Sequence, residues 1–408
     1  MKFLLAVTLE LLTFVGMAGA QTSGSVPLHV KEAGGIRRTA FPVNARIPFG
    51  RGVLADSDHV RLVFSGSEVP AQYTAETRWP DGSVQWLDAD FNVSIGPKET
   101  RTYTLEYGPD VRVQAATRGL SVTEDADSFV VGNVRFSKSG APLIASVKYR
   151  AEDIGTGQNG FAVTDSAGSA HDVSHVESLK TAILKRGPMY VVLEYSGRIP
   201  VDAGYSAPFV IRVEMPNSKS WIRVSAKVQD PGKRLRDVSF QTPFAFSGLP
   251  LIWDFGTEKW TYGSVRTQQE SVTLSQTVKT PEQAEWSVTT GPHGQEQLYD
   301  TSIKGRPVTW GHLQDAKEAV AFAIENVGVI PGTYQFRIEG DGQTSVRFAP
   351  AEPAGELDLT VYEHFVPPPV QIGAATSPAS ALSPLIAVCE RRQYVSSGVP
   401  APKEADGQ

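Results

Sequence analysis

The sequence predicts an all-β protein built from sandwiches or barrels. Hydrophobic and polar residues alternate along several stretches, including residues 102–107, 209–215 and 334–339, as they do in strands with one buried and one solvated face. Gly (37) and Pro (28) recur between these stretches as turn residues. Helical signals are confined to short runs at residues 281–286 and 314–319. Short strands separated by turns are typical of sandwiches and barrels.

Residues 1–20 predict a cleaved signal peptide. A lysine supplies the positive start, residues 3–17 form an apolar run, and Ala18-Gly19-Ala20 is a small-x-small cleavage signature. Glu10 lies within the run and argues against a retained membrane anchor, because a carboxylate is costly inside a bilayer. We therefore expect an exported protein, periplasmic or extracellular, that begins near Gln21.

The net charge of −6 disfavours nucleic acids and anionic membranes as partners. The chain has 38 Lys and Arg residues against 44 Asp and Glu residues, so it lacks the basic footprint that binds nucleic acid or anionic membranes. A local basic cleft can still bind acidic sugars on a protein with this overall charge. The only cysteine, Cys389, allows no intrachain disulfide, and its Pro- and Ser-rich surroundings favour an incidental residue over a nucleophile.

The mature chain is long enough for two domains. We expect a first domain at residues 21–110 and a second at 111–370. A polar, acidic stretch at 124–127 follows this boundary and is typical of a loop. Residues 371–408 are rich in Pro, Ser and Ala, which indicates a linker-like C-terminal tail.

The segment Arg78-Trp79-Pro80-Asp81-Gly82-Ser83-Val84-Gln85-Trp86 predicts a hairpin. In one interpretation, Trp79 and Trp86 form a sugar-stacking platform with polar neighbours. In the other, Asp81 caps the turn and the tryptophans pack in the core. The structural interpretation is favoured, because turn chemistry explains Pro, Asp and Gly at these positions without a ligand.

His171 and His175 allow a metal pair, because residues four apart can share one face of a helix or strand. No further ligands lie nearby in the sequence, so a solvated polar loop is favoured and no metal is predicted. The sequence contains no Gly-x-Ser-x-Gly elbow, Walker loop, dinucleotide fingerprint or His-Glu-x-x-His motif. No cofactor is predicted.

Residues 357–365 supply a second set of candidates. Alternation with a period of two places the aliphatic residues of this stretch on one face and Tyr362 and His364 on the other. A neighbouring phenol and imidazole suit proton transfer, with the neutral His as base. Simple exposure on a solvated sheet face explains the same residues, and this second interpretation is slightly favoured.

Trp310 and His312 follow Lys304 and Arg306 within a few residues. A Trp that stacks on a sugar, cations that meet a carboxylate and a His can together form a uronate subsite, because removal of a proton α to the carboxylate creates an enolate that must be neutralised. An ordinary loop followed by a strand start explains the spacing equally well.

Several motifs, taken in order, resemble the exo-rhamnogalacturonan lyase (YetA-like) family. The motifs similar to its first domain, a RIFT-type β-barrel, are Ile47-Pro48-Phe49-Gly50-Arg51-Gly52-Val53-Leu54, Val69-Pro70-Ala71-Gln72 and residues 78–86. The motifs similar to its second domain, a large supersandwich-like β-sandwich, are Arg186-Gly187-Pro188, Trp310-Gly311-His312-Leu313, Val329-Ile330-Pro331-Gly332 and Tyr362-Glu363-His364. The resemblance implies a small N-terminal barrel followed by an antiparallel sandwich.

Members of this family continue into an (α/α) toroid, which would complete the lyase cleft and has no counterpart in this sequence. We therefore favour an exported carbohydrate-binding or accessory protein that contacts a plant-type or acidic polysaccharide. The alternative is a polysaccharide lyase that performs β-elimination at a uronate of a rhamnogalacturonan-like substrate. In it, Arg306 or Lys304 neutralises the carboxylate, and His364, Tyr362 or His312 exchanges protons. A third hypothesis is a β module that packs against a partner chain carrying the toroid.

Overall fold

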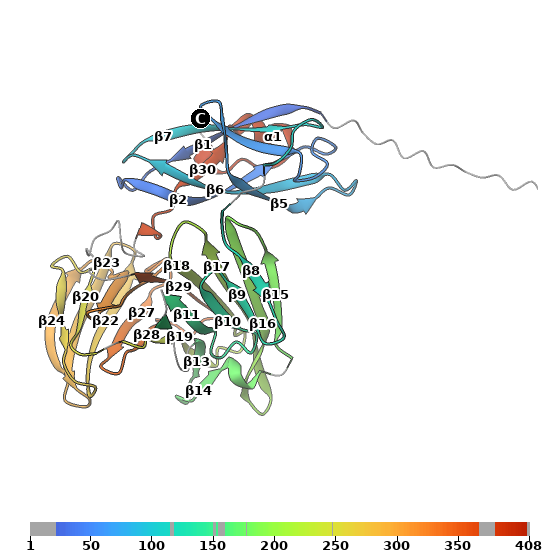
Figure 1. The fold of residues 1–408 in the computed structure, drawn as a ribbon. Helices are drawn as coiled ribbons and strands as arrows, with labels where there is room; N and C mark the ends of the chain where they lie inside the picture. Colours follow the sequence, from blue (N-terminus) through green and yellow to red (C-terminus); the bar gives the residue numbers. More distant parts are fainter. Residues whose placement is uncertain are drawn as a thin grey trace, which may run out of the picture.

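The computed structural model describes residues 22–114, 118–149, 152–153, 160–176, 178–246, 248–366 and 380–405. The signal peptide predicted at residues 1–20 lies outside these ranges. Antiparallel strands make up almost all of the described elements, so the predicted all-β class is confirmed (Figure 1). The two short runs with helical signals form turns and strand ends instead. None of the described helices is long and apolar enough to cross a membrane.

The N-terminal domain consists of two small sheets that enclose one core. Its strands are β1 (Gly24–Lys31), β2 (Arg38–Pro48), β3 (Val60–Phe64), β4 (Ser67–Val69), β5 (Ala71–Arg78), β6 (Val84–Ile95), β7 (Thr100–Tyr107) and β30 (Ile386–Cys389). One sheet has the order β30-β1-β7-β3-β4 and the other β2-β6-β5. Alternate residues such as Leu28, Phe91 and Leu105 are buried between them. The finer assignment as a RIFT-type barrel stays a prediction.

Residues 380–405 correct the prediction of a linker-like tail at 371–408 for the part of it that the structure describes. Residues 380–405 fold onto the N-terminal domain: β30 pairs with β1, the helix α1 (Arg391–Ser396) follows, and the short helix η3 (Lys403–Ala405) ends the described chain. Tyr394 and Ala405 are buried in the domain core. Burial raises the pKa of the Cys389 thiol to about 12, so it stays protonated near neutral pH.

The second domain is a sandwich of two large antiparallel sheets with a small third sheet beside them. The nine-stranded sheet contains, in order, β15 (Lys180–Lys185), β16 (Tyr190–Asp202), β17 (Tyr205–Pro216), β18 (Trp221–Gln229), β29 (Glu356–Val366), β26 (Ala319–Ile324), β25 (Trp310–Gln314), β20 (Leu251–Phe255) and β21 (Thr261–Val265). The eight-stranded sheet contains β14 (Ala170–Asp172), β13 (Gly160–Asp165), β19 (Leu235–Pro243), β28 (Gln343–Pro350), β27 (Gly332–Glu339), β22 (Glu270–Thr280), β23 (Gln283–Pro292) and β24 (Gln297–Gly305). The five-stranded sheet contains β12 (Glu152–Asp153), β11 (Ile144–Tyr149), β10 (Val134–Ser137), β9 (Ser128–Val131) and β8 (Val122–Glu124).

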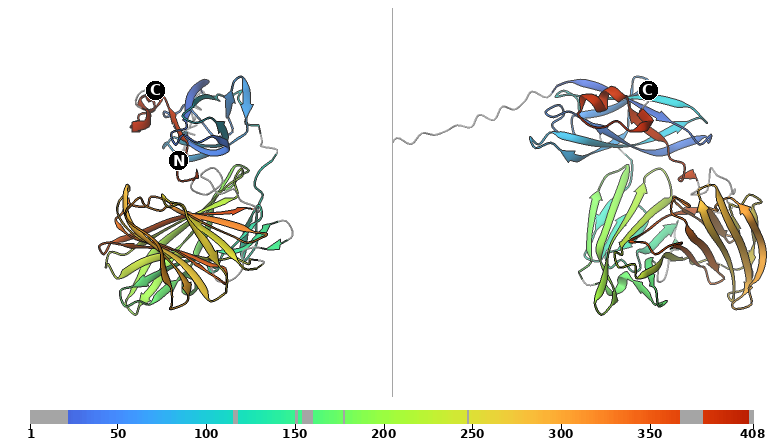
Figure 2. Two further views of the ribbon diagram at one scale, coloured as in Figure 1. Left: turned by 90° about the vertical axis from the view of Figure 1, so that its left-hand side faces the viewer. Right: turned by 180° about the vertical axis from the view of Figure 1, so that it is seen from behind.

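The sandwich core lies between the two large sheets (Figure 2). Phe322 of the nine-stranded sheet meets Phe336 of the eight-stranded sheet with ring centroids 5.4 Å apart. Along β29, Leu359 and Val361 face this core, while Tyr362 packs with the core of the N-terminal domain. The alternation predicted for this strand is therefore confirmed, and each large sheet has an inner and an outer face.

The N-terminal domain sits on the outer face of the nine-stranded sheet (Figure 1). Trp221 of this face packs edge-on against Phe41 of the N-terminal domain, with centroids 5.5 Å apart. The buried Gln72 side chain accepts hydrogen bonds from the backbone N–H groups of Met189 and Tyr190 and donates to the Tyr190 carbonyl. Both the oxygen and the nitrogen of this buried amide are hydrogen-bonded to the other domain. The contact therefore fixes the position of one domain on the other.

We expect Gly187→Ala to destabilise this domain contact. A Cβ at Gly187 would lie 2.2 Å from Oε1 of Gln72, so the buried amide would have to move and lose its backbone partners. The free energy of unfolding should fall by about 2 kcal/mol in denaturant titrations. Gly204→Ala is the matched control, because its nearest neighbour would be 3.9 Å away. Equal losses in both variants would contradict the expected role.

Candidate functional site

The outer face of the nine-stranded sheet brings together four of the predicted site residues. His312 on β25 pairs with Ala321 on β26, which pairs in turn with His364 on β29. Trp310, Ala323 and Tyr362 form the neighbouring row. Residues opposite one another in an antiparallel ladder point to the same face. The two histidines and the Trp and Tyr are therefore separated only by small alanine side chains.

Asp254 and His312 form a buried pair on this face, near the β21 edge of the sheet. The Nδ1 atom of His312 lies 2.9 Å from Oδ1 of Asp254, and the two residues are only 2% and 1% exposed. The other polar atom of each, Nε2 of His312 and Oδ2 of Asp254, has no hydrogen-bond partner among the described residues. A carboxylate on Nδ1 fixes the orientation of the ring and leaves Nε2 as the reactive nitrogen.

Sequence reasoning missed Asp254 because its partner is distant in the chain. The pair exists only because β20 and β25 are neighbours in the sheet, with Asp254 opposite His312. The local signal was a single carboxylate inside the apolar stretch 251–255. A charged residue within a buried strand is rarely left without a partner, and this signal could have marked Asp254 as a candidate.

Tyr362 is held as a neutral phenol by the groups around it. Burial raises the pKa of its hydroxyl well above the usual value, and the neighbouring Glu325 carboxylate raises it further. The Arg223 guanidinium lies 5.9 Å from the ring centroid, contacts Glu214 and is 2.9 Å from Glu325. Burial lowers the pKa of Arg223, but these carboxylates raise it overall. Tyr362 therefore stays protonated near neutral pH, where it can donate a hydrogen bond but is a weaker acid than an ordinary phenol.

His364 and Trp310 are less deeply buried than the Asp254–His312 pair. The His364 ring lies edge-on to Trp221, with centroids 6.3 Å apart. Trp310 packs partly against the N-terminal domain core, and a Cβ on Gly256 would come within 2.3 Å of its Nε1 atom. Trp310 therefore packs against Gly256 and the N-terminal domain. This packing gives the indole a structural role and does not present it as an open platform for a sugar.

The two predicted cations lie elsewhere. Lys304 is on the edge strand β24, and Arg306 follows that strand; both side chains are exposed. The backbone N–H of Arg306 donates to the Glu258 carboxylate. None of the contacts found among the described residues joins the side chain of Lys304 or Arg306 to His312. The structure therefore groups the histidines, Trp310 and Tyr362 but not the carboxylate-binding cations.

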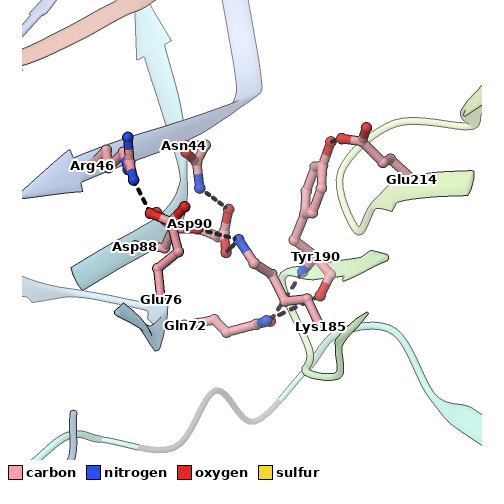
Figure 3. Close-up of polar contacts among 9 residues, drawn as sticks. All are labelled: Asn44, Arg46, Gln72, Glu76, Asp88, Asp90, Lys185, Tyr190 and Glu214. Carbon is pink, nitrogen blue, oxygen red and sulfur yellow. Dashed lines mark hydrogen bonds and ion pairs between the residues drawn. The ribbon is translucent and has the colours of Figure 1, made fainter. Parts of the chain in front are cut away.

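A second polar cluster lies where the two domains meet (Figure 3). The Lys185 ammonium is 2.8 Å from Asp90 and 3.1 Å from Asp88, and Asn44 donates to Asp90 over 2.8 Å. Burial raises the pKa of Asp90. Burial lowers the pKa of Lys185, but the two carboxylates more than offset this and raise it overall. The cluster is an ion pair with a supporting hydrogen bond that links the two domains. Its charged groups bind one another, which leaves them with structural roles.

A cleft of about 470 Å³ with a largely apolar lining opens beside this cluster. The N-terminal domain contributes Asp58, Gln72 and Tyr73, and the sandwich contributes Arg186 and Pro188. The family-like motifs 69–72 and 186–188 thus meet at the domain junction. Because Gln72 is committed to backbone groups of the other domain, this junction explains both motifs without a ligand.

The remaining sequence motifs have structural partners. Asp81 accepts hydrogen bonds from the backbone and hydroxyl of Ser83, so it caps the turn as the structural interpretation of the hairpin expects. Trp79 and Trp86 are partly buried rather than core residues, and the Trp79 indole donates to the Phe49 carbonyl. His171 bonds Asp165, whereas His175 is exposed beside Asp172. Within the described ranges, no group of three or more His, Cys, Asp or Glu residues is placed to hold a metal ion.

Comparisons with known proteins identify the fold. No protein-family model and no curated protein matches the sequence. A solved structure described as a protein of glycosyl hydrolase family 38 from Enterococcus faecalis is similar, with a TM-score of 0.55 and 12% identity, over 90% of this chain and 48% of that one. An α-mannosidase from Enterococcus faecalis is similar at the same TM-score with 13% identity, over 90% of this chain and 46% of that one. The chain thus spans about half the length of these structures.

We expect the stability of the protein to depend on pH through Glu363. This residue lies between Tyr362 and His364 but faces the core, where burial raises the pKa of its carboxyl to about 7. Its pKa is higher in the folded than in the unfolded state, so the stability that the protonated Glu363 carboxyl contributes should be fully present at pH values below its ordinary pKa and should be lost as pH rises through about 7. The loss should reach about 3 kcal/mol, since each pKa unit corresponds to about 1.4 kcal/mol.

Urea unfolding at about pH 5 and pH 8 measures this effect. Glu363→Gln stays neutral and should gain stability relative to the wild type as pH rises. Glu282→Gln, at an exposed position, is the matched control and should follow the wild type. Parallel pH profiles for Glu363→Gln and the wild type would show that the carboxyl titrates normally.

Proposed function

We propose that the protein is an exported carbohydrate-binding or accessory protein that contacts a plant-type or acidic polysaccharide. The observation that carries the proposal is the fold: 90% of the chain is similar to two solved structures described as a glycosyl hydrolase family 38 protein and an α-mannosidase. Fold alone does not fix an activity, so the choice between binding and catalysis depends on the site.

Burial of the candidate catalytic residues favours binding over turnover. A polysaccharide must reach the atoms that exchange protons, within about 3 Å of the reacting group. His312 is 2% exposed and Tyr362 is 9% exposed, and the Trp310 ring is packed between Gly256 and the N-terminal domain. The buried imidazole and phenol are therefore closed to a polysaccharide, whereas Trp310 and His364 are partly exposed.

The alternative function is a lyase that performs β-elimination at a uronate. Its specific support is the Asp254–His312 pair, because a His oriented through Nδ1 has the arrangement of a general base. The reaction would require Nε2 of His312 to become accessible, and a cation such as Lys304 or Arg306 to meet the carboxylate. A partner chain carrying a toroid belongs to this alternative.

Polysaccharide binding and ultraviolet absorbance distinguish the two functions. We expect the mature protein to be retarded on affinity gels that contain an acidic polysaccharide such as polygalacturonate or rhamnogalacturonan, without producing the absorbance of an unsaturated uronate. Absorbance that rises with time and disappears in His312→Ala would establish the lyase. Migration that no acidic or neutral polysaccharide changes would refute the binding function.

Export is part of the proposal and predicts a defined N-terminus. Expression of the full chain in a bacterial host with a secretion system should yield protein in the periplasm or medium, because residues 1–20 carry a cleavage signature. Mass spectrometry of the intact protein should show a chain that begins at Gln21. Ala20→Pro should block cleavage. The proline replaces the second small residue of the small-x-small motif, and it restricts the backbone at the cleavage site. An intracellular chain that retains Met1 would contradict export.

A further inference from the structure

The exposed aromatic side chains of the protein gather in one place. Among the side chains that the structure describes, Trp260, Tyr262 and Tyr299 are the aromatic ones exposed by more than a third, at 50%, 69% and 52%. The other described aromatic side chains are buried or partly buried. Exposing large rings to water is unfavourable, so their concentration at one site indicates a surface that binds something.

These residues lie along the seam where the two large sheets meet at one edge of the sandwich. Tyr262 belongs to β21, the last strand of the nine-stranded sheet, and Tyr299 to β24, the last strand of the eight-stranded sheet (Figure 1). The Tyr299 hydroxyl donates to the Tyr262 carbonyl over 2.9 Å, and the Thr261 hydroxyl donates to Asp300 over 2.8 Å. We call this edge, residues 260–262 with 298–304, the aromatic seam.

The backbone of the aromatic seam holds its rings in fixed positions. Thr289 pairs with Leu298 and Val288 with Asp300, so Tyr299 is the extra residue of a β-bulge. Bulges at sheet edges turn a side chain away from its regular direction. The Tyr299 ring is then fixed by an edge-on contact with the buried Trp253, at a centroid distance of 5.4 Å.

Trp260 adopts a backbone conformation that is strained for a bulky residue. Its φ is 59°, in the left-handed region, and its N–H donates to the Thr257 carbonyl. Glycine or asparagine would occupy this conformation with less strain. Strain of this kind is retained where the side chain has a role, and here it displays an indole that is half exposed.

We propose that the aromatic seam binds a saccharide chain through its rings; this inference rests on the carbohydrate-binding function proposed above and names its surface. The C–H faces of pyranose rings stack on aromatic faces, and rigid rings bind with little loss of side-chain entropy. The exposed cations Lys304 and Arg306 lie on and just after β24. They supply the charge that the carboxylate of an acidic sugar requires.

A second copy of the protein is a less suitable occupant for this surface. Edge strands that pair with another chain are flat and lack charge, whereas β24 carries a bulge, Asp300 and Lys304. Lys259 adds a further cation beside the seam and lies 3.3 Å from Asp300. Bulges and lysines on an edge strand are features that prevent pairing between sheets.

Substitution of Trp260 tests the inference without damage to the fold. Trp260→Gly removes the indole and relieves the strained φ, so its melting temperature should equal or exceed that of the wild type. Its affinity for the polysaccharide that the wild type binds should fall about tenfold or more, as should that of Tyr262→Ala. Val395→Ala, at an exposed apolar position on the N-terminal domain, is the matched control and should bind as the wild type does.

The outcomes separate this inference from the proposed function. Isothermal titration with polygalacturonate and with a neutral mannan gives the affinities, and Lys304→Ala should weaken only the acidic ligand. If the wild type binds and Trp260→Gly and Tyr262→Ala bind equally well, the aromatic seam is wrong and the proposed function stands. If the wild type binds no saccharide, the proposed function fails. Conversion of a wild-type dimer to a monomer by Trp260→Gly would assign the seam to self-association and overturn the inference.

Discussion

The buried amide of Gln72 fixes how the N-terminal domain sits on the sandwich, and the burial of the outer-face side chains that pack with this domain depends on that contact. Its oxygen accepts two backbone N–H groups at the start of β16 and its nitrogen donates back to the same strand. Gly187 leaves room for this amide, and the Lys185–Asp90 pair closes the contact beside it. Because each of these buried groups needs its partner, small rotations between the domains carry a high energetic cost.

This domain contact determines which face of the sandwich is hidden. It buries Trp221, Ala323 and Tyr362 in the core of the N-terminal domain, and the segment 380–405 returns to complete that core. The same docking therefore contributes to the burial that raises the pKa of Tyr362. The opposite edge of the sandwich is free of the N-terminal domain, and there the rings of the aromatic seam reach solvent.

Local patterns in the sequence predicted local structure well. Alternation along β29 placed Tyr362 and His364 on one face correctly, and turn chemistry identified the Asp81 hairpin. Long-range pairing could not be predicted: the contact of Asp254 with His312 depends on the neighbourhood of β20 and β25, and the docking of residues 380–405 depends on β1. Nor could alternation reveal Tyr299, because a bulge breaks the period of two at that residue.

Tyr262 of the aromatic seam and the Asp254–His312 pair belong to one row of the nine-stranded sheet. Tyr262 lies opposite Asp254, and Asp254 lies opposite His312, so the three side chains share the outer face. Exposure falls along this row from 69% at Tyr262 to 1% at Asp254 and 2% at His312. The residues of this row therefore differ in what they can contact. The Tyr262 ring at the open edge can stack on a sugar, whereas the buried Asp254–His312 pair is closed to a ligand from solution.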